Sequence, residues 1–298
     1  MLYQFLAPAK VNLALRIVGR RTDGLHLLWT VMTFFPLYDT LTITLPSADL
    51  QLSCDPPVTP EMENNLVWRA ARCLQEAGGT RQGARLHLHK QIPHGAGLGG
   101  GSSDAATTLL ALNKLWDLHL PLPRLMEIGL QLGADLPIFL QGVAALAEGI
   151  GERITPLPRL AEAELLLINP GVILATGKVF QQWHAQTGTA FAAAEACQLP
   201  PSHTESVHPL LANDLESTAV GMAPVIGEVA QALRQAGAQA TAMSGSGSSL
   251  FGLFADSSQA TTAAHRLRST HPEWKIYTGR TFNQHPFNDE WQSAINSV

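Results

Sequence analysis

The chain has 298 residues, of which 14% are charged and 46% hydrophobic, and its formal net charge at pH 7 is −5. This composition excludes a disordered chain, and the length suffices for two domains with a substantial core. A weakly acidic chain without a basic block is a poor candidate for binding nucleic acid, because neutralisation of phosphates dominates that affinity. It remains compatible with a small phosphate site made of backbone N–H groups.

Cysteine usage and hydropathy favour a cytoplasmic protein. Cys54, Cys73 and Cys197 are odd in number and widely spaced, which predicts free thiols rather than a disulfide framework or a thiolate zinc site. No apolar run approaches the roughly 18 residues of a membrane-spanning helix. The apolar N-terminus is short and has no basic start, so we predict neither a signal peptide nor a membrane partner.

Hydrophobic periodicity predicts strands and helices along the first half of the chain. Alternation of apolar and polar residues predicts strands at 3–19, 39–45 and 85–92. Helical spacing, together with cap and stop residues, predicts helices at 65–77, 104–116 and 123–133. Residues 134–137 are predicted to form a short turn before the apolar run 138–140.

A stretch rich in proline and glutamate at 156–163 predicts a boundary between a first domain, 1–158, and a second, 159–298. The second half contains a strand-like run at 165–168, a helix pattern at 225–235 and a loop of glycines and serines at 243–249 before the apolar run 250–254. Strands and helices are mixed without strict βαβ alternation, which predicts the α+β class rather than a doubly wound sheet.

The segment from Gly95 to Ser103 carries the strongest functional signal. Glycine reaches positive φ and lets backbone N–H groups approach an anion closely. The segment leads from a predicted strand into a helix, whose first N–H groups are unpaired and partly positive. A strand, a glycine loop and a helix N-terminus together form a phosphate cradle that needs no basic side chain.

Two common nucleotide-binding motifs match this glycine-rich segment less well. A P-loop requires lysine at the position of Gly101, and the dinucleotide pattern requires its acid after a strand, whereas Asp117 ends the predicted helix. A loop that merely turns the chain would not need five glycines in seven residues. Asp104 stands in the first turn of the predicted helix, so we expect it to point away from a phosphate or to help hold a metal ion.

Three segments together resemble the superfamily of galactokinase, homoserine kinase, mevalonate kinase and phosphomevalonate kinase (GHMP). They are Pro8-Ala9-Lys10-Val11-Asn12-Leu13, the Pro93–Ala106 stretch with its GLGGGSS core, and Ser244–Ser249. Within the superfamily the chain is most similar to kinases acting on a cytidyl-diphospho derivative of methylerythritol in non-mevalonate isoprenoid synthesis. Further segments that carry this similarity are Arg21-Thr22-Asp23-Gly24-Leu25-His26, Glu63-Asn64-Asn65-Leu66, Leu132-Gly133-Ala134-Asp135-Leu136-Pro137 and Asn169-Pro170-Gly171-Val172.

The resemblance covers residues 5–255 and implies a two-domain fold. A ribosomal-protein-S5-like, ATP-binding and catalytic domain would precede a ferredoxin-like, substrate-binding domain. The implied reaction is ATP-dependent phosphorylation of the C2 hydroxyl of the cytidyl-diphospho sugar alcohol, a small-molecule substrate. The implied cofactors are ATP and Mg²⁺, the latter without assigned ligands, and the implied state is a monomer or homodimer.

The resemblance also implies roles for individual residues. Asp135 would be the catalytic base and Lys10 its electrostatic partner. Asn12, His26, Thr176 and Phe180 would contact the substrate, and a supporting loop would contain Gly245, Ser246 and Gly247. The ATP phosphates would be held by Pro93, His94, Gly95, Ala96, Gly97, Leu98, Gly99, Gly100, Gly101, Ser102 and Ser103. Leu25 departs from the family pattern, because many members have an aromatic residue there that is suited to stacking on the base.

The residues themselves agree with these roles but leave other structural roles and other functions open. Alone, Asp135 fits a turn aspartate after a helix-ending glycine, and Lys10 fits a lysine at a strand end. Lys10 and Asn12 are two positions apart, so both side chains project from the same strand face, which suggests a cleft. A kinase for another alcohol such as homoserine or mevalonate, and a catalytically silent nucleotide-binding regulator, are the competing hypotheses.

Overall fold

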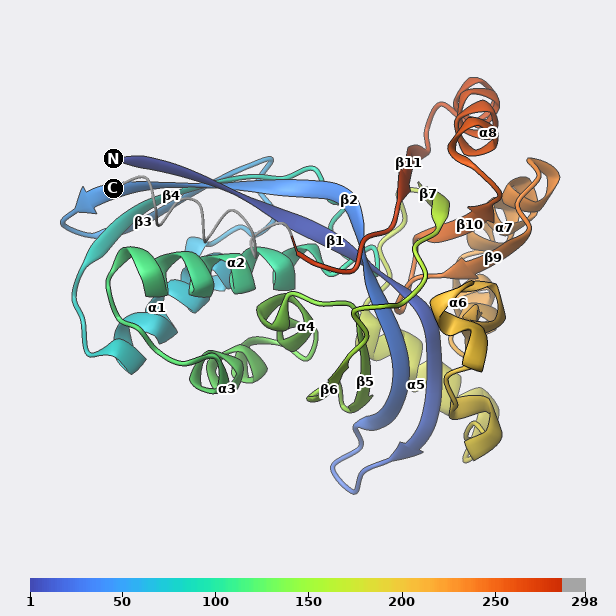
Figure 1. Cartoon of the computed structure of the whole chain (residues 1–298), viewed down its shortest axis with the longest axis horizontal. Coiled ribbons are helices and arrows are strands. Elements are labelled where there is room, and N and C mark those ends of the chain that lie inside the picture. The colour runs from blue at the N-terminus through green and yellow to red at the C-terminus, as the bar shows by residue number, and fades with distance from the viewer. Residues whose placement is uncertain (286–298) are drawn as a thin grey trace.

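The computed structural model describes residues 1–285, which form two β-sheets with helices packed on each (Figure 1). The first sheet has seven strands: the order β3-β4-β2-β1-β8 makes its main path, β5 pairs with β2, and β6 pairs with β5. These strands span β1 Leu2–Arg20, β2 His26–Ser47, β3 Leu50–Asp55, β4 Gly83–His89, β5 Ala145–Gly149, β6 Arg153–Pro156 and β8 Ala212–Asn213. The second sheet has the order β11-β7-β10-β9, with bounds β7 Glu164–Asn169, β9 Ala240–Met243, β10 Leu250–Phe254 and β11 Lys275–Arg280.

Of the α-helices within residues 1–285, four cover the first sheet and four pack on the second. The first group is α1 Leu66–Gly78, α2 Gly100–Leu115, α3 Leu122–Leu132 and α4 Leu136–Gln141, and the second is α5 Thr176–Thr187, α6 Glu216–Met222, α7 Val225–Gln235 and α8 Ser257–Thr270. Each group buries an apolar cluster against its sheet, represented by Phe34 with Leu109 and by Ile168 with Val229. A third cluster, which includes Val11 and Phe251, joins the two sheets. Burial of these faces is the main source of stability, and the mixed architecture confirms the predicted α+β class.

Several elements match their predicted ranges because local signals specify them. The helix predicted at 225–235 has the observed bounds of α7. Helix α1 begins after Asn65, whose side chain accepts a hydrogen bond from the Val67 N–H at 2.9 Å, as its role as an N-cap predicts. The three cysteines are free thiols, as predicted. Among residues 1–285, none of the helices combines the length and hydropathy that crossing a membrane requires.

Other elements extend beyond the sequence prediction. Strand β2 starts at His26 and not at residue 39, because residues 29–35 are buried on both faces and therefore show no alternation. Helix α2 begins at Gly100, four residues earlier than predicted, with Gly99 at φ +70° before it. A Cβ on Gly100 would lie 2.9 Å from Ile92 Cγ2, so close packing requires glycines that helix propensity disfavours. The apolar run 138–140 lies within helix α4.

The two halves of the chain are interleaved in space. Strand β8 adds to the edge of the first sheet by pairing with β1, and Phe282 pairs with Phe34 of β2 through the backbone. Segments of the second half therefore help to build the sheet of the first, and the division at residue 158 stays a prediction. The long strands β1 and β2 run from one group of helices toward the other, which places residues of both halves around one site (Figure 1).

Candidate active site

A cleft of about 790 Å³ opens where the glycine-rich segment, strands β1 and β2, helix α5 and the loop after β9 meet. This volume is in the range of small-molecule sites. Every site residue that the sequence predicts lines the cleft except Ser103 and Gly247. Ser103 lies inside α2 and is fully buried. The N–H of Gly247 donates to the Ser244 carbonyl at 3.0 Å.

The glycine-rich segment has the backbone geometry expected of an anion cradle. Gly95, Gly97 and Gly99 have φ values of +62°, +77° and +70°, in the left-handed region that favours glycine. Two backbone hydrogen bonds fix the segment: Lys10 N–H donates to the Leu98 carbonyl at 2.9 Å, and Ser249 N–H donates to the Ala96 carbonyl at 3.2 Å. Helix α2 begins at the end of this segment, and its first residues, which have unpaired N–H groups, line the cleft.

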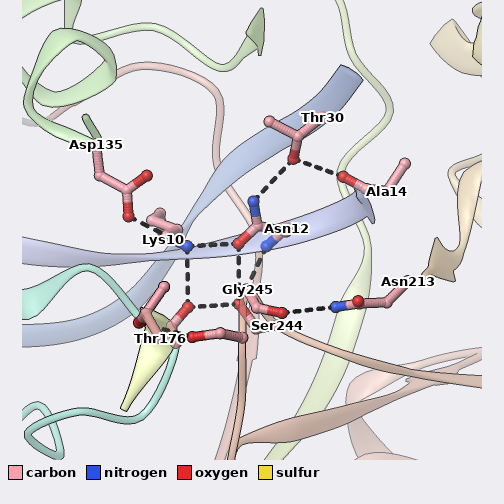
Figure 2. A network of polar contacts seen from close by, with 11 residues as sticks. Lys10, Asn12, Ala14, Thr30, Asp135, Thr176, Asn213, Ser244 and Gly245 are labelled. Atoms are coloured by element: carbon pink, nitrogen blue, oxygen red, sulfur yellow. Dashed lines mark hydrogen bonds and ion pairs between the residues drawn. The ribbon is translucent and has the colours of Figure 1, made fainter. Parts of the chain in front are cut away.

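The Lys10 ammonium is the centre of a buried polar network (Figure 2). Lys10 is 2% exposed, and its Nζ donates to the Asn12 side chain and to the Gly97 carbonyl at 2.9 Å. Ser244 Oγ donates to the same carbonyl at 2.8 Å, so the lysine, the glycine loop and the loop after β9 are held together. A buried ammonium is tolerated when it is paired and hydrogen-bonded in this way.

Asn12 is positioned from three sides. Its Nδ2 donates to Thr30 Oγ1 at 2.8 Å, and Thr30 in turn donates to the Ala14 carbonyl at 2.6 Å. Its backbone N–H donates to Ser244 Oγ at 3.1 Å. These bonds fix the amide so that its oxygen faces Lys10, as predicted for two side chains on one strand face. Asn213, which sequence reasoning did not place in the site, donates to the carbonyls of Met243 and Gly245 and so anchors the second loop.

Asp135 faces Lys10 from the opposite wall of the cleft. It stands immediately before α4, with Oδ2 lying 3.6 Å from Lys10 Nζ. The Asp135 side chain is 43% exposed whereas that of Lys10 is 3% exposed, so the carboxylate borders the open cleft and the ammonium lies behind it. Its side chain does not cap the helix, although a turn aspartate at this position usually would. The structure therefore brings together two groups that the sequence separates widely.

The third group of predicted residues lies at the end of the cleft formed by α5. The His26 ring stacks on Phe180, with 5.1 Å between ring centroids and 25° between planes. Burial, followed by the charge of Arg20 and the neighbouring His184, lowers the pKa of His26 below its usual value of 6.5, which favours the neutral ring. Thr176 Oγ1 is 2.9 Å from Ser246 Oγ, so the start of α5 is tied to the loop after β9.

A buried charge cluster beneath the glycine loop was not predicted. Lys90 pairs with Asp39 and with Asp104, the latter at 2.7 Å, and all three side chains are nearly inaccessible. Asp104 thus points away from the glycine loop, as one of the two expectations for it requires. Burial opposes the charge of Lys90, but the two carboxylates outweigh it and raise its pKa. An isolated lysine in a strand–loop junction gives no sequence signal for such a cluster.

The two carboxylates of this cluster are not equivalent. Asp39 also accepts hydrogen bonds from the backbone N–H groups of Gln91 and Ile92, at 2.6 and 2.9 Å, which stabilise its charge. Asp104 Oδ1 has no partner within residues 1–285. Burial, against the attraction of Lys90 and with the repulsion of Asp39, raises the pKa of Asp104 to about 8. Asp104 is therefore the carboxyl group that holds a proton near neutral pH.

We expect Asp104→Asn to flatten the pH dependence of stability. Because the folded pKa of Asp104 lies near 8 and that of an unfolded aspartate near 4, folded Asp104 keeps a proton that the unfolded chain releases in this range. The free energy of unfolding of the native protein should thus fall as pH rises through this window, and the asparagine variant should lose that contribution. Urea unfolding at several pH values measures both slopes. The variant Asp117→Asn, at an exposed aspartate, should keep the native dependence of the free energy of unfolding on pH. If Asp104→Asn also kept the native dependence, Asp104 would not be the group that holds the proton.

Comparisons with known proteins identify the family to which the chain is similar. Residues 65–143 match the family described as GHMP kinases N terminal domain, and residues 193–273 match GHMP kinases C terminal. The 4-diphosphocytidyl-2-C-methyl-D-erythritol kinase of Geobacter sp. (strain M21) is 43% identical over 270 residues, covering 90% of this chain and 95% of that protein. The kinase of the same name from Chromohalobacter salexigens is 43% identical over 286 residues, covering 95% of this chain and 92% of that protein.

Solved structures show the same relationship. A crystal structure of 4-(cytidine 5′-diphospho)-2C-methyl-D-erythritol kinase superposes with a TM-score of 0.80 at 37% identity and covers 94% of this chain and 99% of that one. Homoserine kinase from Cytophaga hutchinsonii superposes with a TM-score of 0.71 at 19% identity, over 95% of this chain and 96% of that one, and so shares the fold. The fold, the two matched domains and the full-length relatives together show that this chain belongs to the GHMP kinases and, within them, to the family of 4-diphosphocytidyl-2-C-methyl-D-erythritol kinases.

Proposed function

We propose that this chain transfers the γ-phosphoryl group of ATP to the C2 hydroxyl of 4-diphosphocytidyl-2-C-methyl-D-erythritol, in non-mevalonate isoprenoid synthesis. The observation that carries the proposal is the pair of Asp135 and Lys10, 3.6 Å apart at the open end of the glycine-rich loop. Phosphoryl transfer requires donors for the phosphates and an acceptor for the proton of the attacking hydroxyl. The cleft is lined by both kinds of group.

The glycine-rich segment is the phosphate-binding element of the proposal. Its left-handed glycines and the first N–H groups of α2 point positive partial charge into the cleft without a basic side chain. Such preorganised donors stabilise charge on a transferring phosphoryl group. Residues 1–158 would thus bind the nucleotide, and residues 159–298 would bind the alcohol with help from β1 and β2.

Asp135 is the proposed general base. Its carboxylate accepts the proton of the C2 hydroxyl as the hydroxyl oxygen attacks the γ-phosphorus, and the bond from the γ-phosphorus to the β,γ-bridging oxygen breaks to release ADP. The Lys10 ammonium, 3.6 Å from the Asp135 carboxylate, stabilises the negative charge that develops on the transferring phosphoryl group. Asn12 fixes the direction of the ammonium through its own three hydrogen bonds. His26, Phe180 and Thr176 are the proposed contacts for the remainder of the substrate.

Mg²⁺ is a proposed cofactor of the reaction. Within residues 1–285 no group of three or more histidine, cysteine or acidic side chains is arranged to hold a metal ion. The cleft does offer the Asp135 carboxylate and the Ser102 hydroxyl, which are hard oxygen donors of the type Mg²⁺ prefers. These residues fit an ion held mainly by nucleotide phosphates and water. When bound, the ion would neutralise phosphate charge.

The free thiols of the three cysteines favour a cytoplasmic location for the protein.

A coupled assay for ADP release with a panel of alcohols tests the proposal. We expect turnover with 4-diphosphocytidyl-2-C-methyl-D-erythritol, at a kcat/KM at least about 100-fold above that for homoserine or mevalonate, because a site with buried polar groups rejects substrates that leave them unpaired. Turnover with another alcohol alone would assign the chain a different acceptor. ATP binding without ADP release for every alcohol would instead support a silent nucleotide-binding regulator.

A further inference from the structure

The turn between β5 and β6 packs against the residue that precedes Asp135. Gly151, in this turn, is buried and has φ +114°, a backbone conformation that favours glycine. A Cβ on Gly151 would lie 2.8 Å from the Ala134 carbonyl oxygen and 3.5 Å from the Ala134 Cβ. The two backbone segments are therefore too close to admit a methyl group between them. The β5–β6 hairpin, residues 145–156, thus lies beside the start of α4 (Figure 1).

Hydrogen bonds and close packing fix the shape of this turn. The Gly151 N–H donates to the Glu148 carbonyl at 3.1 Å, and the Ile150 N–H donates to Glu152 Oε2 at 2.6 Å. The Glu152 carboxylate also lies against Gly149, where a Cβ would be 2.2 Å from Glu152 Oε1. A hydrogen bond to a charged acceptor is stronger than one between neutral groups. The turn that contacts Ala134 is therefore held by its own residues.

The other end of the hairpin is continuous with the strands that hold the Lys10 ammonium. Strand β5 pairs with β2, with Ala147 opposite Thr30. Thr30 accepts the hydrogen bond from Asn12 Nδ2, and the Asn12 side-chain oxygen accepts one from Lys10 Nζ. The hairpin therefore connects the strand that positions the ammonium with the segment that carries the Asp135 carboxylate.

The Asp135 side chain needs such a support. It does not cap α4, and its Oδ2 lies 3.6 Å from Lys10 Nζ, farther than the roughly 2.7–2.9 Å of a hydrogen bond between charged groups. The side chain is 43% exposed, and Ala134 is exposed as well. The place of the carboxylate therefore depends on the backbone that carries it, and Gly151 packs on that backbone.

We propose that Gly151 is a positioning residue, and that the β5–β6 hairpin sets the distance between the Asp135 carboxylate and the Lys10 ammonium. This inference rests on the proposed function, because it takes Asp135 as the general base. Its physical reason is that a displacement of about 1 Å in a reacting group can lower a rate about 100-fold. The hairpin acts on the reaction only through the carboxylate.

Steady-state kinetics of Gly151→Ala test the proposal. We expect kcat to fall about 10- to 100-fold, because the added methyl group displaces the Ala134 carbonyl and with it the Asp135 carboxylate. The KM for ATP and the inhibition constant of cytidine 5′-diphosphate should stay within about twofold of native, because the glycine-rich segment and α5 are unaltered. Gly237→Ala, with φ +100° and open space around the Cβ, is the matched control for backbone strain and should keep the native kcat.

A second pair of variants keeps the proposal testable if Gly151→Ala does not fold. Glu152 is exposed, so its substitution should leave the core intact. Glu152→Ala removes the acceptor of the Ile150 N–H and should lower kcat about three- to tenfold. In Glu152→Gln the amide oxygen still accepts this hydrogen bond, so kcat should stay within about twofold of native. An equal kcat in native protein and Glu152→Ala would overturn the role of the turn.

A double-mutant cycle distinguishes positioning from a general structural effect. In the Asp135→Asn background, Gly151→Ala should lower the residual kcat by less than about twofold, because the carboxylate through which the hairpin acts is already absent. An additive loss would overturn the inference. Loss of turnover in Asp135→Asn with a native kcat in folded Gly151→Ala would overturn the inference alone. Near-normal turnover of Asp135→Asn would overturn the proposed base and, with it, this inference.

Discussion

Asp135→Asn should lower kcat by about 10²–10⁴-fold while the KM for ATP changes little, because an asparagine amide keeps the shape of the side chain but cannot accept the hydroxyl proton. The Asp135 side chain borders the cleft and takes no part in capping α4, so its loss should leave the fold intact. Steady-state ADP release at saturating substrate gives kcat, and calorimetric titration with a non-hydrolysable ATP analogue gives nucleotide affinity. Asp117→Asn, a substitution at an exposed aspartate that does not line the cleft, should leave both values unchanged.

Lys10→Met separates the role of the ammonium from that of the carboxylate. Removal of the ammonium leaves Asp135 without its ionic partner and leaves the Gly97 carbonyl without one of its donors. We therefore expect both a lower kcat and a higher KM for ATP, in contrast to the selective loss of kcat in Asp135→Asn. Near-normal turnover of Asp135→Asn would show that the proton goes elsewhere, whatever Lys10→Met does.

The sequence predicted those parts of the site that local chemistry encodes. Five glycines in seven residues, placed before a helix, indicate a phosphate loop without knowledge of the fold. Lys10 and Asn12 are paired by the two-residue period of a strand, and the structure shows both in one buried network. The start of α1 could be predicted from Asn65, because capping depends only on the nearest backbone groups.

Contacts between distant segments could not be predicted from local patterns. Ser244 contacts Asn12, 232 positions away in sequence, and Gly97, 147 positions away, and Arg20 contacts His184, 164 positions away. None of these contacts produces a periodic pattern in the sequence, because each depends on how the two sheets pack together. The sequence prediction missed the first part of β2, from His26 to residue 38. Residues 29–35 in this part are buried on both faces of the sheet, which removes the alternation that marks a half-buried strand.

The proximity of Asp135 to Lys10 came from the family resemblance and not from spacing. Taken alone, Asp135 is a turn residue, and nothing near it in sequence points to an ammonium. The structure supplies the missing step, because α4 packs on α2 and α2 starts at the loop whose Gly97 carbonyl binds Lys10. The role of Asp135 as base stays a prediction that the asparagine variant tests.

Gly97→Ala should remove most ATP binding and destabilise the protein. Gly97 has φ +77°, and a Cβ there would lie 2.0 Å from the Ser244 carbonyl oxygen, a backbone atom that cannot swing aside. Left-handed backbone costs an L-residue about 1–2 kcal/mol, and overpacking typically adds about 1–3 kcal/mol. The two loops must separate to admit the methyl group, which displaces the carbonyl that Lys10 binds. A raised KM for ATP and a lower urea midpoint are the measurements.

Two matched glycines separate the sources of this effect. Gly79 has φ +61° but open space around it, so Gly79→Ala should cost only the backbone strain of about 1–2 kcal/mol and leave the KM for ATP unchanged. Gly221 lies within α6, with open space and no positive φ, so Gly221→Ala should be neutral or stabilising by up to about 1 kcal/mol. If Gly97→Ala behaved like Gly79→Ala, strain alone would account for it, and close contact between the two loops would not be what shapes the phosphate site.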